Sequence, residues 1–336
     1  MREKTKRFLN IREIAKLSGV STATVSRVLN APDTASEKTR NRVLEIVKKY
    51  NYIPNQSARN VFSPTSNTIA LFVFDLQNPF YIHMIKELNH LCLENNYTLL
   101  ICDVEDSLER EQKYFEYCMA NRCAGIIYTI GATRDSIGIA AHYDVPIVMI
   151  DRSPFKDKNC CSIESDAKKS FKLLTDYLYH LNHRKIGFIT ADEIFICSKL
   201  RLDNFISAMH NLNLEVPDRY IKAGHYNFQS GSDAFDYFYS MEDGPTAIIA
   251  ANDQVARGFI SRAYDLGIHI PDYFSVCGYD AVEYDKTAPI ITSIHQNVKE
   301  IAKKAFDYIT NPPGNDAPAN FIVDVSLRIG NTCKRI

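Results

Sequence analysis

From residue 68 onward, short apolar segments alternate with amphipathic segments of helical length. The apolar segments are expected to be strands, at residues 68–74, 97–102, 125–128, 146–150, 185–190, 247–250 and 275–278. The segments between them repeat apolar residues at helical spacing, at residues 79–94, 108–121, 166–180, 199–212, 230–240 and 254–266. Continuous apolar strands separated by helices predict parallel sheets that are covered by helices on both faces.

The number of expected strands exceeds what one compact doubly wound domain needs. We therefore expect two lobes, divided near residue 163. In open α/β sheets, ligands bind at the carboxyl ends of the strands, and two such lobes enclose a cleft. Polar and aromatic residues follow directly after four of the expected strands, at residues 75–81, 151–152, 252–253 and 279–280. These residues are candidates for a ligand site.

Residues 10–30 have a different pattern, which is typical of a helix-turn-helix. Asn10 can cap a first helix and Gly19 can end it, and a second helix is expected to start at Ser21. The apolar residues of each helix share one face, at spacings of three and four: Ile11, Ile14 and Ala15 in the first, and Val25, Val28 and Leu29 in the second. Ser36 is expected to cap a third helix that buries Val43, Ile46, Val47 and Tyr50.

The other face of the second helix is polar and carries Thr22, Ala23, Ser26 and Arg27. Such a face suits the major groove of DNA, because a guanidinium can bond two acceptors of guanine and a methyl group can meet the methyl of thymine. A small helical hairpin with a solvated polar face would show the same periodicity, so the pattern alone leaves both interpretations open.

Charge favours the nucleic-acid interpretation. Residues 1–62 carry 13 Lys and Arg against five Asp and Glu, whereas the whole chain has a net charge of −1. A basic segment gains affinity for phosphates by releasing counterions. No secretory signal or membrane span is visible, and the nine scattered cysteines indicate buried thiols in a reducing cytoplasm rather than a zinc site between Cys118 and Cys123.

Taken in order, these segments resemble the LacI/GalR family of bacterial repressors along essentially the whole chain. The matching segments are VSTATVSRVLN, SEKTR and NYIPN in the head, then NPFY at 78–81, Asp151 with Arg152, LRLDNF with Arg201, ANDQVARG at 251–258 and GYD at 278–280. The resemblance implies an all-α helix-turn-helix DNA-binding head and an α/β two-lobed core, which is similar to periplasmic binding proteins and has two doubly wound parallel sheets.

The resemblance also sets the expected domain boundaries. The DNA-binding head spans residues 1–55, and a hinge helix with a linker follows at 56–67. The ligand-binding and dimerisation core spans 68–336, with an N-lobe at about 68–163 and 296–323 and a C-lobe at about 164–293 and 324–336. The working unit that it implies is a homodimer.

For the head, the resemblance implies base contact by Thr22, Ala23 and Arg27, with phosphate contacts nearby from Ser21, Ser26, Asn30 and Ser36. Two heads would read a near-palindromic operator with half-sites about one helical turn apart. In the hinge, Val61 stands where the family usually inserts a leucine into the minor groove. Valine is shorter and β-branched, so either the DNA kink is smaller or the neighbouring Phe62 shares the role.

For the cleft, the resemblance implies an aromatic wall with a few directional polar groups. Phe80, Tyr81 and Tyr226 would form the wall, and hydrogen bonds to the ligand would come from Arg201, Asn252 and Asp280, with Asp151 as a further acceptor. The alternatives are core packing for the aromatic residues and an ion pair between the lobes for Arg201. Asp253 is expected to cap the helix that follows it.

The sequence therefore predicts a sequence-specific DNA-binding regulator, a repressor of a carbohydrate-utilisation operon controlled by a sugar or sugar derivative in the cleft. A purine-type corepressor is the alternative effector, and the sequence leaves open whether the effector induces or corepresses. A non-regulatory sugar-binding protein would explain residues 68–336 but not the basic head. Motifs of a nucleophile elbow or phosphate loop are not seen, so no enzyme, cofactor or metal is expected.

Overall fold

The computed structural model describes residues 9–53, 65–105, 107–129, 134–151, 160–191, 196–282, 289–312 and 319–336. The chain divides into two compact units, Met1–Ser66 and Asn67–Ile336. The expected hinge helix with Val61 and Phe62 lies outside the described residues, and so does Arg152.

The first unit contains three helices, and local side chains fix where the first two begin. They are α1 (Ile11–Ser18), α2 (Thr22–Asn30) and α3 (Glu37–Lys49), with a short 3-10 turn η1 (Pro32–Thr34) between the last two. The Asn10 side chain accepts from the Glu13 amide at 3.0 Å, and the Ser21 hydroxyl accepts from the Thr24 amide at 3.1 Å. Gly19 ends α1 in the left-handed conformation. The predicted start and end of α1 and the start of α2 are confirmed.

The three helices enclose a small apolar core, made by the buried side chains of Ile14, Ala15, Val25, Val28 and Val43. The prediction that Tyr50 is buried is wrong, because α3 ends at Lys49 and Tyr50 is 43% exposed. Asn51 then turns the chain with a positive φ of 47°, and Tyr52 packs into the core instead. Ser36 occupies the cap position of α3, but its hydroxyl donates to the Thr39 hydroxyl rather than accepting from the backbone.

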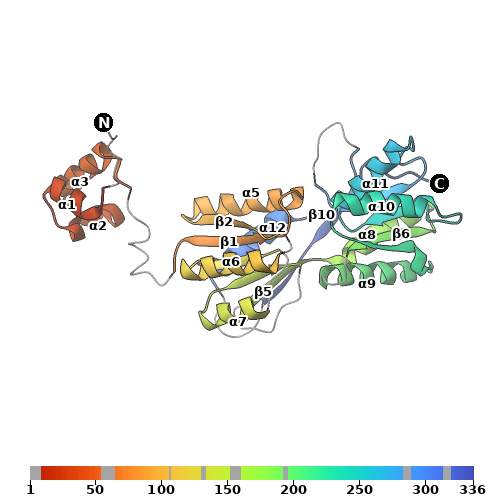
Figure 1. Ribbon diagram of the computed structural model, residues 1–336, viewed down its shortest axis with the longest axis horizontal. Helices are drawn as coiled ribbons and strands as arrows, with labels where there is room; N and C mark the ends of the chain where they lie inside the picture. The colour runs from red at the N-terminus through yellow and green to blue at the C-terminus, as the bar shows by residue number, and fades with distance from the viewer. Residues whose placement is uncertain are drawn as a thin grey trace. The chain divides into compact units, whose positions relative to one another are not determined.

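The second unit contains two six-stranded sheets, each between two layers of helices (Figure 1). The first sheet is parallel throughout, in the order β11-β5-β4-β3-β1-β2. Its strands are β1 (Thr68–Val73), β2 (Thr98–Asp103), β3 (Gly125–Tyr128), β4 (Ile147–Ile150), β5 (Cys160–Ser165) and β11 (Ala319–Val323). One face is covered by α5 (Pro79–Glu94) and α12 (Val298–Thr310), the other by α6 (Leu108–Ala120) and α7 (Arg134–His142).

The second sheet has the order β12-β10-β9-β8-β6-β7, and only the β10–β12 pair is antiparallel among the described strands. Its strands are β6 (Ile186–Ala191), β7 (Ile221–Gly224), β8 (Ala247–Ala250), β9 (Ser275–Asp280), β10 (Thr292–Gln296) and β12 (Val325–Arg328). One face is covered by α8 (Ala167–His180) and α9 (Ile196–Asn211), the other by α10 (Phe228–Tyr239) and α11 (Asp253–Asp265). A 3-10 turn, η2 (Asp218–Tyr220), precedes β7.

Buried strand residues alternate between the two helical layers, as β1 shows. Ile69, Leu71 and Val73 face the layer of α5 and α12, while Ala70 and Phe72 face the layer of α6. The prediction of two doubly wound parallel sheets is therefore confirmed. None of the helices within the described residues is long and apolar enough to cross a membrane.

Candidate functional site

A cleft lies where the carboxyl ends of the strands of both lobes meet. Its empty volume is about 540 Å³, a figure that includes open solvent at its mouth. All seven residues that the sequence analysis selected line it: Phe80, Tyr81, Asp151, Arg201, Tyr226, Asn252 and Asp280. The other lining residues are Phe74, Asp75, Asn78, Thr129, Ile150, Cys197 and Gln296.

Arg201 links the two lobes at the floor of the cleft. It projects from α9 of the C-lobe, is 7% exposed, and donates to the carbonyl oxygen of Ala251 at 2.6 Å. Its second terminal nitrogen lies 3.5 Å from the carboxylate of Asp151, which follows β4 of the N-lobe. The guanidinium also stacks on the ring of Tyr279, 4.0 Å from its centroid. The ion pair between the lobes is therefore present, and it lies within the cleft lining.

The groups around Arg201 keep its guanidinium protonated. Burial acts to lower the pKa of Arg201, but Tyr226, Tyr279 and Asp151 together outweigh it, and the pKa is raised. Burial raises the pKa of Asp151, with the Arg201 charge opposing that shift. The pair is therefore one fixed cation beside a carboxyl group that a ligand hydroxyl could reach.

Asp280 is the second carboxyl group of the cleft, and its backbone is strained. It has a φ of 114° and Ala281 follows with a φ of 50°, conformations that are rare for residues other than glycine and are concentrated at functional sites. The amide of Gln296 donates to its carboxylate at 2.6 Å, and the Ser165 hydroxyl donates to the other end of the Gln296 amide at 2.6 Å. Burial raises the pKa of Asp280 well above its usual value.

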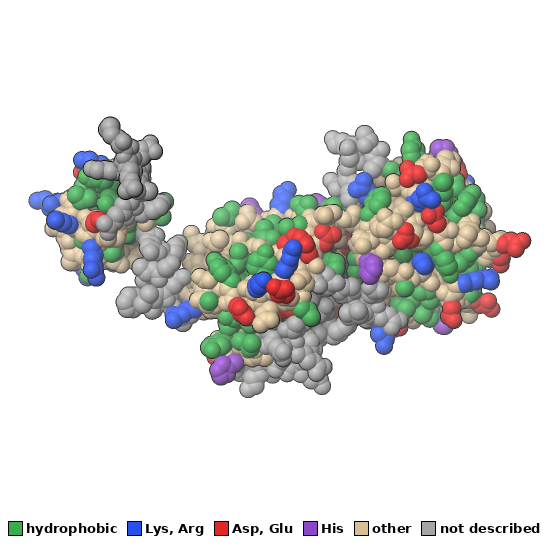
Figure 2. All heavy atoms as spheres, in the orientation of Figure 1, with side chains coloured by type: hydrophobic (Ala, Val, Ile, Leu, Met, Phe, Trp, Pro, Cys, Tyr) green, Lys and Arg blue, Asp and Glu red, His purple; other side chains and the backbone are tan. Residues whose placement is uncertain are grey.

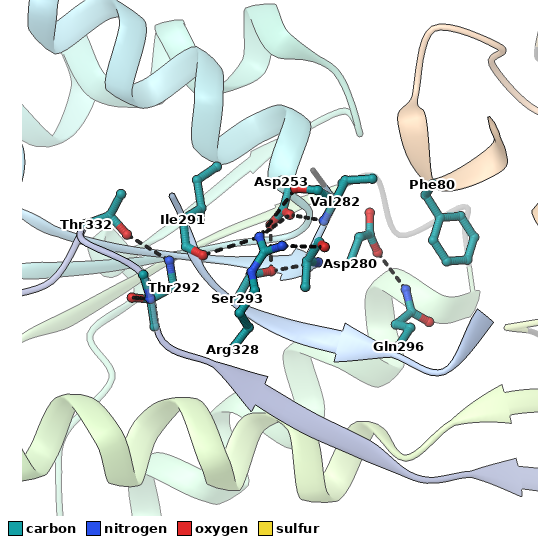
Figure 3. Close-up of polar contacts among 12 residues, drawn as sticks. Phe80, Asp253, Asp280, Val282, Ile291, Thr292, Ser293, Gln296, Arg328 and Thr332 are labelled. Carbon is teal, nitrogen blue, oxygen red and sulfur yellow. Dashed lines mark hydrogen bonds and ion pairs between the residues drawn. The ribbon is translucent and has the colours of Figure 1, made fainter. Parts of the chain in front are cut away.

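Asp253 holds the turn that follows Asp280 (Figure 3). Its buried carboxylate accepts from the Val282 amide at 2.8 Å and from the Ser293 hydroxyl at 2.6 Å, and the Ala281 amide donates to the same hydroxyl at 3.0 Å. A side chain at Gly278 would not fit, because a Cβ there would lie 2.0 Å from the Asp253 carboxylate. The approach of Asp253 to β9 thus depends on a glycine.

The prediction that Asp253 caps α11 is wrong, because the cap is Asn252. The Asn252 side-chain oxygen accepts from the Val255 amide at 2.9 Å, and its nitrogen donates to the Tyr226 carbonyl at 3.1 Å. Both ends of this amide are therefore used to hold α11 and the segment after β7, although the residue also lines the cleft.

Arg328 completes the support of this turn from β12. Its guanidinium donates to the carbonyl oxygens of Ala281 at 2.7 Å and Val282 at 3.3 Å, and it lies 3.9 Å from the Asp253 carboxylate. In Figure 3 these groups form one cluster, with Asp280 and Gln296 on its side toward Phe80. The strained backbone of Asp280 is thus held by paired donors and acceptors on both sides of the turn.

The aromatic side chains contribute to both the cleft and the core. Phe80 and Tyr81 are each 6% exposed and pack with the N-lobe core at the start of α5, with ring centroids 5.5 Å apart. The hydroxyl of Tyr226 lies 2.9 Å from that of Ser198, and burial raises the pKa of Tyr226. Core packing and cleft lining are therefore not exclusive for these residues.

In the head, the residues implied to contact bases lie on the solvent side of α2. Thr22, Ala23 and Arg27 are exposed, whereas Val25 and Val28 on the other side are buried. Of the residues implied to lie near phosphates, Ser21, Asn30 and Ser36 are exposed and Ser26 is half-buried. Lys and Arg side chains gather on the visible face of this unit (Figure 2).

Comparison with known proteins agrees with both units. A family model described as "Bacterial regulatory proteins, lacI family" matches residues 10–55, and a periplasmic binding protein-like domain matches residues 175–333. The chain is 30% identical over 302 residues to the HTH-type transcriptional repressor PurR of Vibrio cholerae serotype O1 (strain M66-2), covering 89% of this chain and 90% of that protein. It is 31% identical over 302 residues to the ribose operon repressor of Escherichia coli (strain K12), covering 89% of this chain and 91% of that protein. The chain belongs to the LacI family of bacterial regulatory proteins.

Solved structures show the same fold. The Lac repressor dimer bound to operator and the anti-inducer ONPF matches with a TM-score of 0.85 at 22% identity, covering 98% of this chain and 100% of that one. A complex of the transcriptional regulator CelR with cellobiose matches with a TM-score of 0.70 at 21% identity, covering 96% and 99%. As a LacI-family member with a helix-turn-helix head and a two-lobed core, the protein is a DNA-binding transcriptional regulator.

Several lining residues of this LacI-family cleft were missed by the sequence analysis. Thr129 directly follows β3, which was expected as a strand, so the rule that ligands bind at the carboxyl ends of strands could have found it. Gln296 ends β10, which was not expected from the sequence, so the same rule could not have found it. Asn78 lies in the expected segment 75–81 but was not assigned a ligand contact, and its side chain caps α5 by accepting from the Phe80 amide. Cys197 lies in the first turn of α9, where the sequence carries no signal of the kind used for the other residues.

Proposed function

We propose that this protein represses an operon for carbohydrate use and that its operator affinity is set by a neutral sugar or sugar derivative in the cleft. The observation that carries the proposal is the composition of the lining. Arg201 is the one Lys or Arg among the described lining residues, whereas three carboxyl groups lie there, on Asp75, Asp151 and Asp280. Carboxylates accept hydrogen bonds from hydroxyl groups, so this balance favours a neutral polyol over an anion.

A purine base is the second candidate. Four aromatic side chains line the cleft, on Phe74, Phe80, Tyr81 and Tyr226, and a planar base can stack on such rings. The relatives named PurR also favour this candidate. A purine base donates to the three carboxyl groups only through a few N–H groups, whereas a sugar carries a hydroxyl group on most of its carbons, which is why we place the sugar first.

The contacts between the lobes supply a means of control. Asp151 pairs with Arg201 across the cleft, and Ser165 of the N-lobe bonds Gln296, which bonds Asp280 in the C-lobe. A ligand that donates hydrogen bonds to Asp151 or Asp280 competes with these contacts, so it has different affinities for different arrangements of the lobes. The difference between these binding free energies limits how far an effector can shift the equilibrium between the arrangements of the lobes.

In the head, we assign base contact to Thr22, Ala23 and Arg27, and phosphate contact to Ser21, Ser26, Asn30 and Ser36. Their positions on and beside α2 support this assignment, since all are exposed except Ser26, which is half-buried. We further propose that the protein works in the cytoplasm as a homodimer, since a near-palindromic operator needs two heads. The Lac repressor structure that matches this chain is a dimer on its operator.

Thermal unfolding with a panel of sugars, sugar phosphates and purine bases tests the cleft assignment. A ligand at 100 times its Kd should stabilise the core by about 2.7 kcal/mol, seen as a higher melting temperature. Arg201→Ala should abolish the shift, and Arg262→Ala, on the outer side of α11 in an ion pair with Asp236, should keep it. Repeating the measurement with operator DNA tells an inducer from a corepressor.

The outcome also separates the two candidates. A response confined to sugars supports the first, and a response confined to purines supports the second. If no compound shifts the melting temperature, or if Arg201→Ala responds as the unchanged protein does, the cleft is not the effector site.

A further inference from the structure

Two cysteines of the C-lobe lie within reach of each other. Cys277 is in the middle of β9 and Cys333 is near the C-terminus, and their sulfur atoms are 3.5 Å apart. The backbone on either side holds them in register. The Val276 amide donates to the Thr332 carbonyl at 2.8 Å, and the Lys334 amide donates to the Ser275 hydroxyl at 3.0 Å.

Cys333 also differs from the other cysteines in exposure. All nine cysteines lie within the described part of the chain, and eight of them are buried, whereas Cys333 is partly exposed. Cys102, Cys118 and Cys123 also lie close together, but all three are enclosed in the N-lobe core. A small oxidant in solution therefore reaches Cys333 first.

The two thiols differ in acidity in the direction that disulfide formation needs. The hydrogen bond with the Cys277 thiol lowers the pKa of Cys333, and the hydroxyls of Thr292 and Thr332 add to that effect. The same contact, together with burial, raises the pKa of Cys277. Cys333 is thus the better nucleophile, and Cys277 lies beside it as the second thiol.

We propose that Cys277 and Cys333 form a redox-sensitive pair that peroxide converts to a disulfide. The Cys333 thiolate attacks one peroxide oxygen, so that an S–O bond forms, the O–O bond breaks, and water leaves after the second oxygen takes a proton. The Cys277 thiol then loses its proton and attacks the Cys333 sulfur, an S–S bond forms, the S–O bond breaks, and a second water leaves. The two thiols lose two electrons and the peroxide gains two.

The disulfide would join the C-terminal segment to the strand that carries cleft residues. Tyr279, which stacks on Arg201, comes two residues after Cys277 and packs in the same cluster, and Asp280 ends the strand. The link closes a long loop, since it spans residues 277–333, and so it reduces the conformational freedom of the unfolded chain. This inference is independent of the effector and of operator binding.

The test treats the full-length protein with hydrogen peroxide and then analyses it by peptide mapping under non-reducing conditions. We expect a peptide pair joined through Cys277 and Cys333, two hydrogen atoms lighter than its parts and separated again by dithiothreitol. The melting temperature of the oxidised protein should rise by about 5 °C, because the loop is long. Cys333→Ser should lose both the link and the rise, and Cys92→Ala, which removes a buried thiol of the N-lobe, should keep both.

Cys277→Ala provides a second check on the order of the steps. Without its partner, Cys333 should accumulate as a sulfenic acid that dimedone traps, while the unchanged protein is trapped less because the disulfide forms. The proposal is overturned if peroxide leaves both thiols free, if Cys333 is modified in the unchanged protein without a link to Cys277, or if Cys333→Ser shows the same rise in melting temperature.

Discussion

At the scale of single residues, the titration of Asp253 makes the free energy of unfolding depend on pH. Burial raises the pKa of Asp253 to about 7, even though Ser293, Val282 and Arg328 oppose the shift. Between about pH 4 and pH 7 the folded state holds this proton and the unfolded state does not, so stability falls as pH rises through that window. Relative to Asp253→Asn, which does not titrate, the wild type should lose up to about 4 kcal/mol of unfolding free energy across it.

Urea unfolding at a series of pH values measures this difference. An exposed carboxyl group on the neighbouring helix gives the control, because Asp233→Asn should leave the curve parallel to that of the wild type. Parallel curves for Asp253→Asn as well would show that Asp253 is not protonated in the folded protein in this range.

The same residue shows what local sequence cannot reveal. The caps at Asn10 and Ser21 were predictable because each side chain accepts from an amide three residues further on. Asn182 follows α8 with a φ of 77°, a left-handed conformation that asparagine tolerates better than most residues. The side-chain partners of Asp253 are instead brought in from β10 and β12, 40 or more residues away, and no local pattern encodes them.

At the scale of elements, strands with a continuous apolar sequence and most amphipathic helices were predicted, whereas most strands with polar residues were not. Four strands, β5, β7, β10 and β11, and two helices, α7 and α12, were not predicted from the sequence. β7 is a half-exposed edge strand, and β10 has the sequence TSIHQ, which is buried although mostly polar. These strands owe their conformation to pairing with a neighbour rather than to their own pattern.

Helix pairing in the C-lobe depends on two glycines. Gly231 of α10 and Gly258 of α11 let the helices meet backbone to backbone, since a Cβ at Gly258 would lie 1.8 Å from the Phe228 carbonyl oxygen. Gly258→Ala should therefore separate the helices and destabilise the core by about 3 kcal/mol. Gly138→Ala is the matched control, because no atom lies within 4 Å of a Cβ there and alanine should stabilise α7 by about 1 kcal/mol.

Chemical unfolding of the two variants measures both effects. A loss of stability for Gly258→Ala with no loss for Gly138→Ala supports the close approach of α10 and α11. If the two substitutions change stability alike, helix propensity rather than packing governs both positions.

At the scale of the whole molecule, the cleft was predictable because parallel strands bring their carboxyl ends to one edge. Seven residues from six separate segments were placed in one cleft by that rule and by the family resemblance. The rule does not give distances between side chains. It could therefore not show that Arg201 reaches Asp151, or that the side-chain amide of Asn252 bonds the Tyr226 carbonyl instead of being left for a ligand. Those contacts depend on how the lobes face each other, which no single segment determines.

Operator recognition is the property that needs the whole molecule, because one head on one half-site binds weakly. Selection of DNA fragments by the purified protein should enrich a near-palindrome with half-sites about one helical turn apart, and light scattering should show a dimer at micromolar concentration.

Arg27→Ala should cost about 1–3 kcal/mol of binding free energy at one position of each half-site and relax the base preference there, because a bidentate guanidinium contact is lost. Arg262→Ala changes a residue of the ligand-binding core rather than of the head, so it should leave the selected motif and the affinity for operator DNA unchanged. A monomer in solution would contradict the proposal that two heads bind one operator. An unaltered motif for Arg27→Ala would contradict the proposal that this face of α2 contacts the bases.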